Sequence, residues 1–468
     1  MTVDTAIRWK ASRYTARTQA ADGGLVIYCS SNGAIAGVAP EEASLVRSAL
    51  SRSTITEGPL EGVLQELAEA GFLVPIDTDE DQTLQNLRNE RIQGGRTLHL
   101  ILLPTEDCNF RCVYCYEQFK RHKMRRYVQD SVVEWFDRNA NKYDNVFVEW
   151  FGGEPLHAAD VVISLGKRLK DVAEHHGVVH ISGMTTNGYN LTPTVMRQLL
   201  EVNCNTFTIT LDGVKGEHDQ HRVLADGSPT FDTIWKNILD LKATDLPFRV
   251  RIRHNFDPES LTKANEFLVL LSDSLGDDAR FNDVNLRQIA KWGGPNDAEM
   301  VVCDARQGID ARYNLLNDAL KMGFYEHALK FYLEPGGFVC YASNPNSLVI
   351  GADGKIMKCT LELDTEDRNI VGQVHRDGVF EIRGDKMAPW IMSGSGDGTC
   401  ATCFMAPSCQ GAACAKERFD RGIRPCPTDK KRIGQVLNLI YESEQLPPSS
   451  SSNGRKQIPL PVVILADK

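Results

Sequence analysis

The stretch CNFRCVYCYE, residues Cys108–Glu117, places three cysteines within eight positions at the spacing C-x3-C-x2-C. It follows TLHLILL (97–103), whose apolar residues are typical of a buried strand. Three thiolates are one fewer than the four that normally close a structural zinc site or hold an iron–sulfur cube. A catalytic metal site keeps such a vacant position for its substrate. The stretch therefore predicts a metal-binding loop at the end of a strand, with a zinc knuckle as the alternative.

The residues that follow this loop alternate between strand and helix patterns as far as about residue 290. Strand patterns lie at 97–103, 145–151, 178–186, 206–213, 248–256 and 281–290, and amphipathic helix patterns at 127–141, 158–175, 192–202, 230–243 and 259–274. The alternation predicts an α/β fold whose core is a partial (β/α)6 TIM-like barrel. In such barrels the chemistry takes place at the C-terminal ends of the strands, which is where the three cysteines lie.

The composition excludes several classes of function. The formal net charge is −10 and there is no long basic run, which argues against nucleic acid or an anionic membrane as a partner. The N-terminal residues lack the apolar core of a signal peptide, and no stretch is long enough for a membrane span. We therefore expect a cytoplasmic protein. Because the cytosol keeps thiols reduced, clustering among its 13 cysteines indicates metal binding rather than disulfides.

The remaining patterns predict six regions along the chain. Two of them lack a strong apolar period: an acidic linker with a solvated helix, and a cysteine-rich segment that we expect metal to stabilise. The C-terminal IPLPVVILADK is expected to dock on the edge of a sheet. The regions are a winged-helix-like domain (1–80), the linker (81–95), the barrel (96–290), a helical bridging region (291–335), the cysteine-rich segment (336–430), and a C-terminal helix and tail (431–468).

The triplet Cys108, Cys112 and Cys115 resembles the signature of the radical S-adenosylmethionine (SAM) enzymes. The resemblance implies that these cysteines hold a [4Fe–4S] cluster whose fourth iron binds the amino and carboxylate groups of SAM. The cluster would then cleave SAM to a 5′-deoxyadenosyl radical that abstracts hydrogen. The resemblance also implies that Tyr114, just before the last cysteine, packs on the adenine.

Three further motifs, each at the end of a predicted strand, strengthen this resemblance. In FGGEP (Phe151–Pro155), it implies that Gly152 and Gly153 let the backbone approach SAM and that Glu154 accepts from the SAM ammonium. TTNG (185–188) and TITLDG (208–213) imply that Asn187 and Thr210 bind the ribose or the carboxylate. Farther on, HDQHR (218–222) resembles the HxxxR of similar enzymes, which implies that Arg222 contacts a carboxylate.

The cysteine-rich segment resembles the SPASM extension of radical SAM enzymes, whose seven cysteines hold two auxiliary [4Fe–4S] clusters. The chain departs from the usual pattern by one residue between Cys409 and Cys414. A zinc ribbon is the alternative. The resemblance implies one cluster with four cysteine ligands and a second cluster with only three. The fourth position of the second cluster would be filled by Cys303 or by a substrate thiolate, or it would stay open. The implied ligands are Cys400, Cys403, Cys409 and Cys426 for the first, and Cys340, Cys359 and Cys414 for the second.

SPASM enzymes mostly modify peptides, so the resemblance implies a maturase of a ribosomally synthesised precursor peptide. Residues 1–80 resemble a RiPP recognition element, a module to which a leader peptide adds as a strand. The implied reaction is a thioether or carbon–carbon cross-link, with three clusters and a flavodoxin- or ferredoxin-type electron donor. Peptide epimerisation is the chief alternative, with Cys303 as a candidate hydrogen donor.

Two other functions agree less well with the residues. An anaerobic sulfatase maturase, which forms formylglycine, has an acidic base after the cysteine of G-x4-C, whereas this chain has Thr360. The nearby Glu362 and Asp364 are expected to be surface charges. A non-enzymatic iron–sulfur electron carrier would leave the barrel and the GGE motif without a purpose.

Overall fold

The dominant element of the fold is a sheet whose ten strands run in the order β12-β11-β10-β9-β8-β7-β13-β14-β15-β16. The computed structural model describes residues 7–51, 55–337, 339–363, 366–391, 398–445 and 462–465. All six predicted barrel strands are confirmed, and neighbouring strands among them pair in parallel. They are β7 (Thr97–Leu102), β8 (Asn145–Trp150), β9 (Val179–Thr186), β10 (Cys204–Thr210), β11 (Arg249–Phe256) and β12 (Asp283–Gln288).

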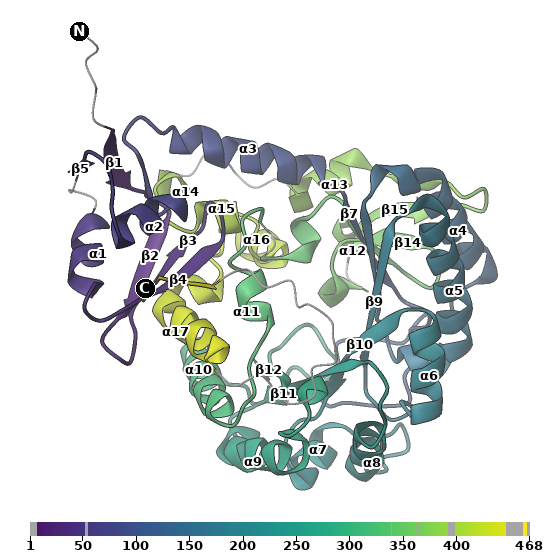
Figure 1. Ribbon diagram of the computed structural model, residues 1–468. Helices are drawn as coiled ribbons and strands as arrows, with labels where there is room; N and C mark the ends of the chain where they lie inside the picture. Colours follow the sequence, from purple (N-terminus) through teal and green to yellow (C-terminus); the bar gives the residue numbers. More distant parts are fainter. Residues whose placement is uncertain are drawn as a thin grey trace.

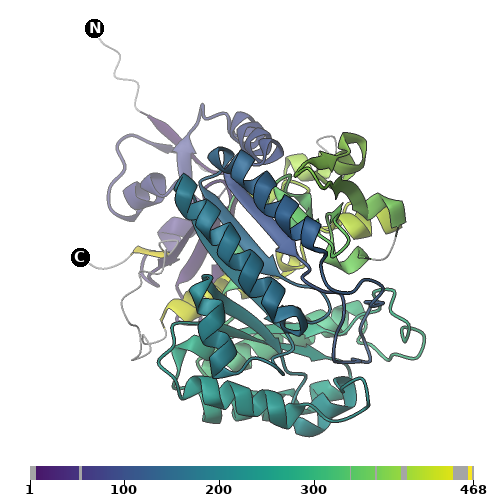
Figure 2. The same ribbon diagram turned by 90° about the vertical axis from the view of Figure 1, so that its right-hand side faces the viewer.

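Helices cover the outer face of this curved sheet, as Figures 1 and 2 show. The predicted helices are confirmed as α4 (Arg126–Asn139), α5 (Ala159–His176), α6 (Pro193–Glu201), α8 (Phe231–Lys242) and α9 (Ala264–Leu275), and α7 (Lys215–His221) is an addition. In α4, Val128, Val132 and Phe136 recur every four residues and are fully buried against the sheet. Together with the strands they form the main hydrophobic core.

The sheet extends beyond β7 instead of closing into a barrel. Strand β13 (Ser347–Ile350) pairs in parallel with β7, and three antiparallel strands follow it. The added strands are β14 (Lys355–Met357), β15 (Ile370–Val374) and β16 (Phe380–Ile382). The cysteine-rich segment thus contains regular strands that its sequence pattern does not indicate, and they join it to the barrel.

Short helices make up most of the rest of the C-terminal third. The bridging region is helical as predicted, with α10 (Ala305–Lys321) and α11 (Ala328–Phe331). The cysteine-rich segment contains α12 (Glu366–Asn369), α13 (Gly384–Ile391), α14 (Gly398–Ala401), α15 (Ala406–Cys409) and α16 (Ala415–Arg421), and the C-terminal helix is α17 (Ile433–Glu444).

The N-terminal residues form two small sheets and two helices. Strands β1 (Arg8–Ala11), β5 (Ile55–Glu57) and β6 (Leu73–Pro75) make one sheet, and β2 (Thr15–Gln19), β3 (Leu25–Cys29) and β4 (Ala34–Val38) make the other, with helices α1 (Ala43–Ala49) and α2 (Val63–Glu69). Strand β17 (Val462–Leu465) pairs in parallel with β4. The prediction that the C-terminal tail docks on a sheet edge is therefore confirmed.

Two connections tie the N-terminal residues to the C-terminal half. The Tyr28 hydroxyl donates to the carbonyl oxygen of Leu333 (2.5 Å) and lies 2.5 Å from the Ser408 hydroxyl. Helix α3 (Glu80–Gln93), which the acidic linker sequence predicts, is capped by Asp79 and carries the buried Arg91 in its last turn. The Arg91 guanidinium donates to Gln410, to the carbonyl of Ser343 and to the carbonyl of Ile391.

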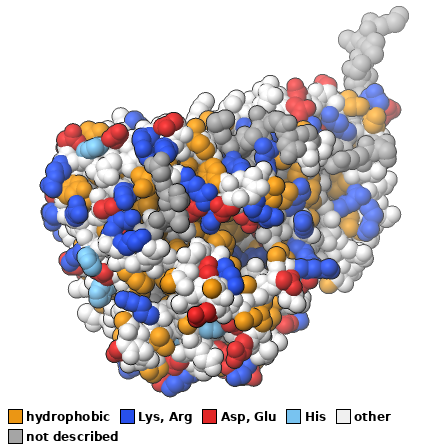
Figure 3. All heavy atoms as spheres, turned by 180° about the vertical axis from the view of Figure 1, so that it is seen from behind, with side chains coloured by type: hydrophobic (Ala, Val, Ile, Leu, Met, Phe, Trp, Pro, Cys, Tyr) orange, Lys and Arg blue, Asp and Glu red, His pale blue; other side chains and the backbone are white. Residues whose placement is uncertain are grey.

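The described surface shows no single charged face in the view of Figure 3, where acidic and basic side chains are interspersed. None of the helices in the described part of the chain has the length and apolar character needed to cross a membrane.

Candidate active site

The three-cysteine loop connects β7 to α4 and is held by a second segment, residues 221–225. Arg111 and Val113 donate backbone hydrogen bonds to Val223 (2.8 Å) and His221 (2.9 Å), and Ala225 donates to Asn109 (2.9 Å). Burial raises the pKa of the Cys108 thiol above its usual value, and the nearby acidic and thiol groups raise it further. Burial likewise raises the pKa of Cys115 to about 12. Three thiols in such a site need a bound metal to stabilise their thiolate forms.

The glycines of the GGE motif pack directly against the start of this loop. A Cβ on Gly153 would lie 2.4 Å from the carbonyl oxygens of Glu106 and Asp107. Gly152 has φ +117°, and a Cβ there would lie 2.5 Å from the Thr105 carbonyl. The backbone N–H of Glu154 also donates to Asp107 (2.9 Å). The motif therefore docks the end of β8 on the cysteine loop.

The Glu154 carboxylate lies in the site with an acceptor position to spare. It is only 1% exposed. One oxygen accepts from the Thr186 hydroxyl (2.7 Å) and the Leu156 N–H (2.9 Å), and the other accepts from the Asn187 N–H (2.7 Å). Burial raises the pKa of Glu154, and these hydrogen bonds oppose that shift. Because a carboxylate has about four acceptor positions, the second oxygen retains one for an ammonium group.

Asn187 and Thr210 lie at the same edge of the sheet, as the sequence predicts. The Asn187 side chain donates to Asn109 of the cysteine loop (2.8 Å) and accepts from the N–H of Tyr189 (2.9 Å). Thr210 is buried at the end of β10. The structure therefore brings Glu154 and Asn187 together at the cysteine loop, and Thr210 ends the next strand.

A buried polar network surrounds the Tyr114 hydroxyl. This hydroxyl donates to the carboxylate of Asp212 and accepts from Arg222 (2.8 Å) and Asn255 (3.0 Å). The Nε of Arg222 is buried without a partner among the described residues, which leaves a donor for an anionic group. Sequence reasoning missed Asp212 and Asn255, because an Asp-Gly pair such as Asp212-Gly213 is common in turns and Asn255 belongs to no motif.

A second group of thiols is formed by Cys340, Cys359 and Cys414. Burial raises the pKa of Cys359 to about 12, and the other two thiols add to the shift. Burial also raises the pKa of Tyr116 well above its usual value, with Glu117, Cys115 and Cys359 adding to it, so this side chain lies near both groups. Cys303 is buried elsewhere, where the charges that act on it are those of Asp257 and Asp304.

A third group contains Cys403, Cys409 and Cys426, and Cys400 lies just before it, with its carbonyl accepting from the Cys403 N–H (3.3 Å). Burial raises the pKa of Cys409 to about 11, and Cys403 and Cys426 contribute. Two cations accompany this group, because Arg424 lies 3.8 Å from the Cys400 sulfur and Lys430 lies 3.6 Å from the Cys426 sulfur. Among the described residues, no three His, Cys, Asp or Glu side chains converge closely enough to hold a single metal ion.

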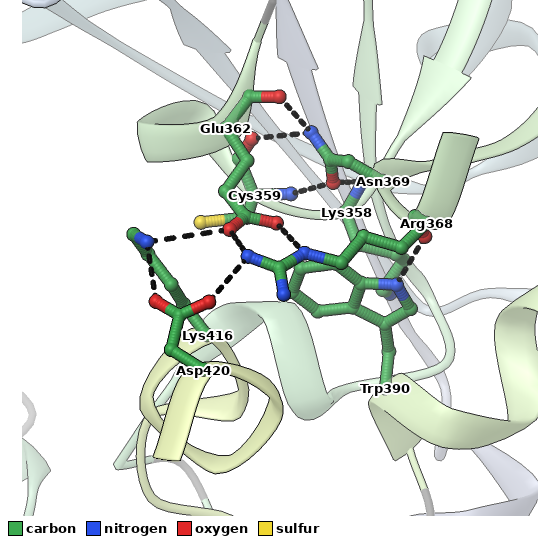
Figure 4. A network of polar contacts seen from close by, with 8 residues as sticks. All are labelled: Lys358, Cys359, Glu362, Arg368, Asn369, Trp390, Lys416 and Asp420. Atoms are coloured by element: carbon green, nitrogen blue, oxygen red, sulfur yellow. Dashed lines mark hydrogen bonds and ion pairs between the residues drawn. The ribbon is translucent and has the colours of Figure 1, made fainter. Parts of the chain in front are cut away.

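The expectation that Glu362 is a surface charge is wrong. Its side chain is 1% exposed, and Arg368 and Lys416 neutralise it, as Figure 4 shows. Asp364 lies outside the described residues. Thr360, which stands where a sulfatase maturase has its acidic base, lies with its hydroxyl 2.8 Å from that of Tyr341.

Known proteins resemble parts of this chain. Residues 102–258 match the family model of the radical SAM superfamily. An uncharacterized protein of Methanocaldococcus jannaschii is 26% identical over 32% of this chain and 51% of its own length. A probable GTP 3′,8-cyclase of Thermococcus kodakarensis is 27% identical over 26% of this chain and 38% of its own. The chain thus spans about half, or less, of the length of these curated relatives.

A solved structure shows the same fold over a longer part of the chain. The protein anSMEcpe, with bound AdoMet and the Kp18Cys peptide, matches with a TM-score of 0.57 and 16% identity. The match covers 75% of this chain and 100% of that one. The α/β fold, the cysteine loop and the family match agree with one another. Residues 102–258 of the chain therefore form a radical SAM domain.

Proposed function

We propose that this enzyme is a cytoplasmic SPASM-type maturase of a ribosomally synthesised precursor peptide. Cys108, Cys112 and Cys115 would hold the SAM-binding cluster, which supplies the electron that cleaves SAM to a 5′-deoxyadenosyl radical. The two other thiol groups would hold auxiliary clusters, and a flavodoxin- or ferredoxin-type protein would provide electrons. A leader peptide would bind the N-terminal residues. The product would be a thioether or a carbon–carbon cross-link.

The observation that carries this proposal is the second thiol group, Cys340, Cys359 and Cys414. The charges of Cys359, from this group, and of Cys115 both act on the buried Tyr116, which supports a position of the group near the cysteine loop. A cross-link removes two hydrogens from the peptide, but the 5′-deoxyadenosyl radical takes only one of them. An iron–sulfur group close to the loop is suited to accept the second electron. The anSMEcpe structure, which holds AdoMet and a peptide in a similar fold, supports a peptide substrate.

The residues around the loop would bind SAM and keep it oriented. The free acceptor position of Glu154 is suited to the SAM ammonium, and Asn187 and Thr210 end the strands beside it. Arg222 offers its unpartnered Nε to a carboxylate, while Tyr114 holds its guanidinium in place. Because Tyr114 is tied to Asp212 and Asn255 through its hydroxyl, its ring has a fixed orientation for the adenine.

Glu154→Gln is expected to weaken SAM binding by roughly 1.5–3 kcal/mol, because it removes a charge-assisted hydrogen bond to the ammonium. Isothermal titration of the reconstituted enzyme with SAM measures this change. Glu149→Gln, on the same strand but hydrogen-bonded to His99, is the matched control and is expected to leave SAM affinity unchanged. Equal affinities for wild type and Glu154→Gln would refute the role of the GGE motif.

Mass spectrometry of candidate precursors separates the proposed reaction from its rivals. Short peptides encoded beside the gene, incubated with enzyme, SAM and reductant, are expected to lose two hydrogens when cross-linked. An epimerase leaves the mass unchanged in H2O but adds one deuterium in D2O. Cys303 lies near Asp257, which comes just beyond the end of β11. Cys303 is the candidate hydrogen donor for an epimerase reaction. A formylglycine product, which Thr360 disfavours, loses the sulfur when it forms from cysteine. When it forms from serine it also loses two hydrogens, and labelling of its aldehyde with a hydrazine distinguishes it from a cross-link. Either rival outcome would replace the cross-linking proposal.

A further inference from the structure

Lys358 is a buried cation beside the second thiol group. It directly precedes Cys359, just beyond the end of β14, and its relative exposure is 0%. Its ammonium donates to the carbonyl oxygens of Asn344 (2.6 Å) and Ser347 (2.5 Å). No carboxylate pairs with it among the described residues. An ammonium is buried in this way only at a large cost, unless an opposite charge lies near.

The candidates for that opposite charge are the neighbouring thiols. Burial lowers the pKa of Lys358 to about 7 in the iron-free protein, and the negative charge of Cys340 opposes this shift. The carbonyls of Asn344 and Ser347 belong to the segment that follows Cys340, so Lys358 joins this segment to the backbone of Cys359. A four-iron cluster on Cys340, Cys359 and Cys414 carries a net negative charge. The buried cation and the thiol donor set therefore fit an anionic iron–sulfur group.

The surrounding network keeps Lys358 in this place. Figure 4 shows Asn369 beside Lys358 and Cys359. The fully buried Asn369 side chain accepts from the N–H groups of Lys358 (3.0 Å) and Cys359 (2.9 Å), and it donates to the carbonyls of Cys359 and Glu362 (both 2.9 Å). All four of its hydrogen-bonding positions are used. These hydrogen bonds therefore hold the backbone before and after Cys359 in place.

Two other nearby cations are neutralised by carboxylates. Lys416, two residues after Cys414, forms ion pairs with Glu362 (3.5 Å) and Asp420 (2.6 Å), and Arg368 binds the same two carboxylates. The positive charges of Lys416 and Arg368 are thus balanced within the protein. Arg418 is a further cation on which the charges of Cys340 and Cys414 act, but it is partly exposed, whereas Lys358 is fully buried.

We propose that Lys358 is the counter-charge of the iron–sulfur group on Cys340, Cys359 and Cys414, and that it raises the reduction potential of this group. This inference rests on the proposed function, which assigns a cluster to these cysteines. One-electron reduction adds a negative charge to the cluster, and a fixed positive charge nearby stabilises the reduced form. Lys358 thereby makes this cluster a better acceptor for the electron that leaves the substrate.

The test compares Lys358→Met and Lys358→Gln with Lys355→Met, in the background of Cys108→Ala, Cys112→Ala and Cys115→Ala. Lys355 lies on β14, three residues before Lys358, is partly exposed and faces Asp353 at 3.5 Å, so it is the matched control. Dithionite titration followed by electron paramagnetic resonance reports the potentials of the auxiliary clusters. We expect both Lys358 variants to make reduction of one cluster roughly tenfold less favourable, about 59 mV. The other cluster and the Lys355 control are expected to stay unchanged.

A second measurement uses the iron-free protein, where the thiol group is empty. Without a cluster the wild type buries a lysine side chain that no carboxylate among the described residues pairs with, so Lys358→Met is expected to raise the midpoint of thermal unfolding, whereas Lys355→Met leaves it unchanged. An unfolding midpoint for Lys358→Met at or below that of the control would contradict the inference.

The variants separate the possible results. Gln retains a donor for a carbonyl but has no charge, so equal potential shifts in Met and Gln support the counter-charge. A shift confined to Met assigns the effect to hydrogen bonding and overturns the inference, as do potentials equal to those of the Lys355 control. If Cys340→Ala, Cys359→Ala and Cys414→Ala together remove no iron, the auxiliary cluster itself is absent. That result defeats the proposed function rather than Lys358 alone.

Discussion

Replacing Cys108, Cys112 and Cys115 with Ala is expected to abolish the reductive cleavage of SAM and to lower the iron content from about twelve to about eight per chain. The three thiols form one group on a loop that the GGE motif and residues 221–225 hold in place. Nothing else in that group can retain the SAM-binding cluster, whereas the other cysteines lie in separate groups. Iron analysis and 5′-deoxyadenosine formation, both after anaerobic reconstitution, measure the two effects.

Cys204→Ala is the control for this triple variant. Cys204 is buried on β10 and belongs to none of the three thiol groups, so its loss is expected to leave iron content and SAM cleavage unchanged. Cleavage that survives in the triple variant would remove the assigned site. Stoichiometric zinc with only about four irons in the wild type would refute the auxiliary clusters and favour the zinc alternative for residues 336–430.

The barrel and its cysteine loop were predictable because their signals are local. Each barrel strand is a short apolar stretch followed by a loop motif, and each covering helix has its own apolar period. The sequence does not reveal why the GGE glycines are needed. In the structure Gly152 and Gly153 make room for the backbone of residues 105–107, an approach between segments that lie more than 40 residues apart.

The extended sheet and the buried charges were not predictable, because their partners are distant in the sequence. Strand β13 has only the four residues SLVI and becomes a strand by pairing with β7, about 250 positions earlier. Glu362 reads as a surface charge in KCTLE, but Arg368 and Lys416 neutralise it and permit its burial. A lysine beside a cysteine likewise gives no sign that its ammonium lies in the core.

The contacts of the N-terminal residues change what a truncation is expected to do. The sequence predicts a separate domain at 1–80, whose removal would spare the rest of the chain. In the structure the Tyr28 hydroxyl bonds to Leu333 and Ser408, and the Ser30 hydroxyl donates to the carbonyl of Phe404. Both Phe404 and Ser408 lie between cysteines of the third thiol group. The N-terminal strands therefore support the backbone that carries Cys403 and Cys409.

Deleting residues 1–80 is expected to remove about four irons, those of the group with Cys403 and Cys409, while SAM cleavage without peptide persists. The cleavage is expected to survive because the backbone hydrogen bonds, the Asn187 contact and the close glycine approaches that hold the cysteine loop come from residues beyond Arg96. Iron analysis and 5′-deoxyadenosine formation measure the two effects on the same protein. Tyr28→Phe is the milder companion variant. It removes a hydroxyl between Leu333 and Ser408, and its expected cost is about 1–3 kcal/mol in the free energy of unfolding.

The companion variant also decides between two roles for the N-terminal residues. If they only support the third thiol group, Tyr28→Phe and the deletion are expected to lower precursor modification in proportion to the iron lost. If they also bind a leader, the deletion abolishes modification beyond its iron loss, because the core peptide loses the gain in effective concentration that a bound leader provides. A deletion variant that retains all of its iron would contradict the supporting role, since Tyr28 and Ser30 would then contribute nothing to the fold around Cys409.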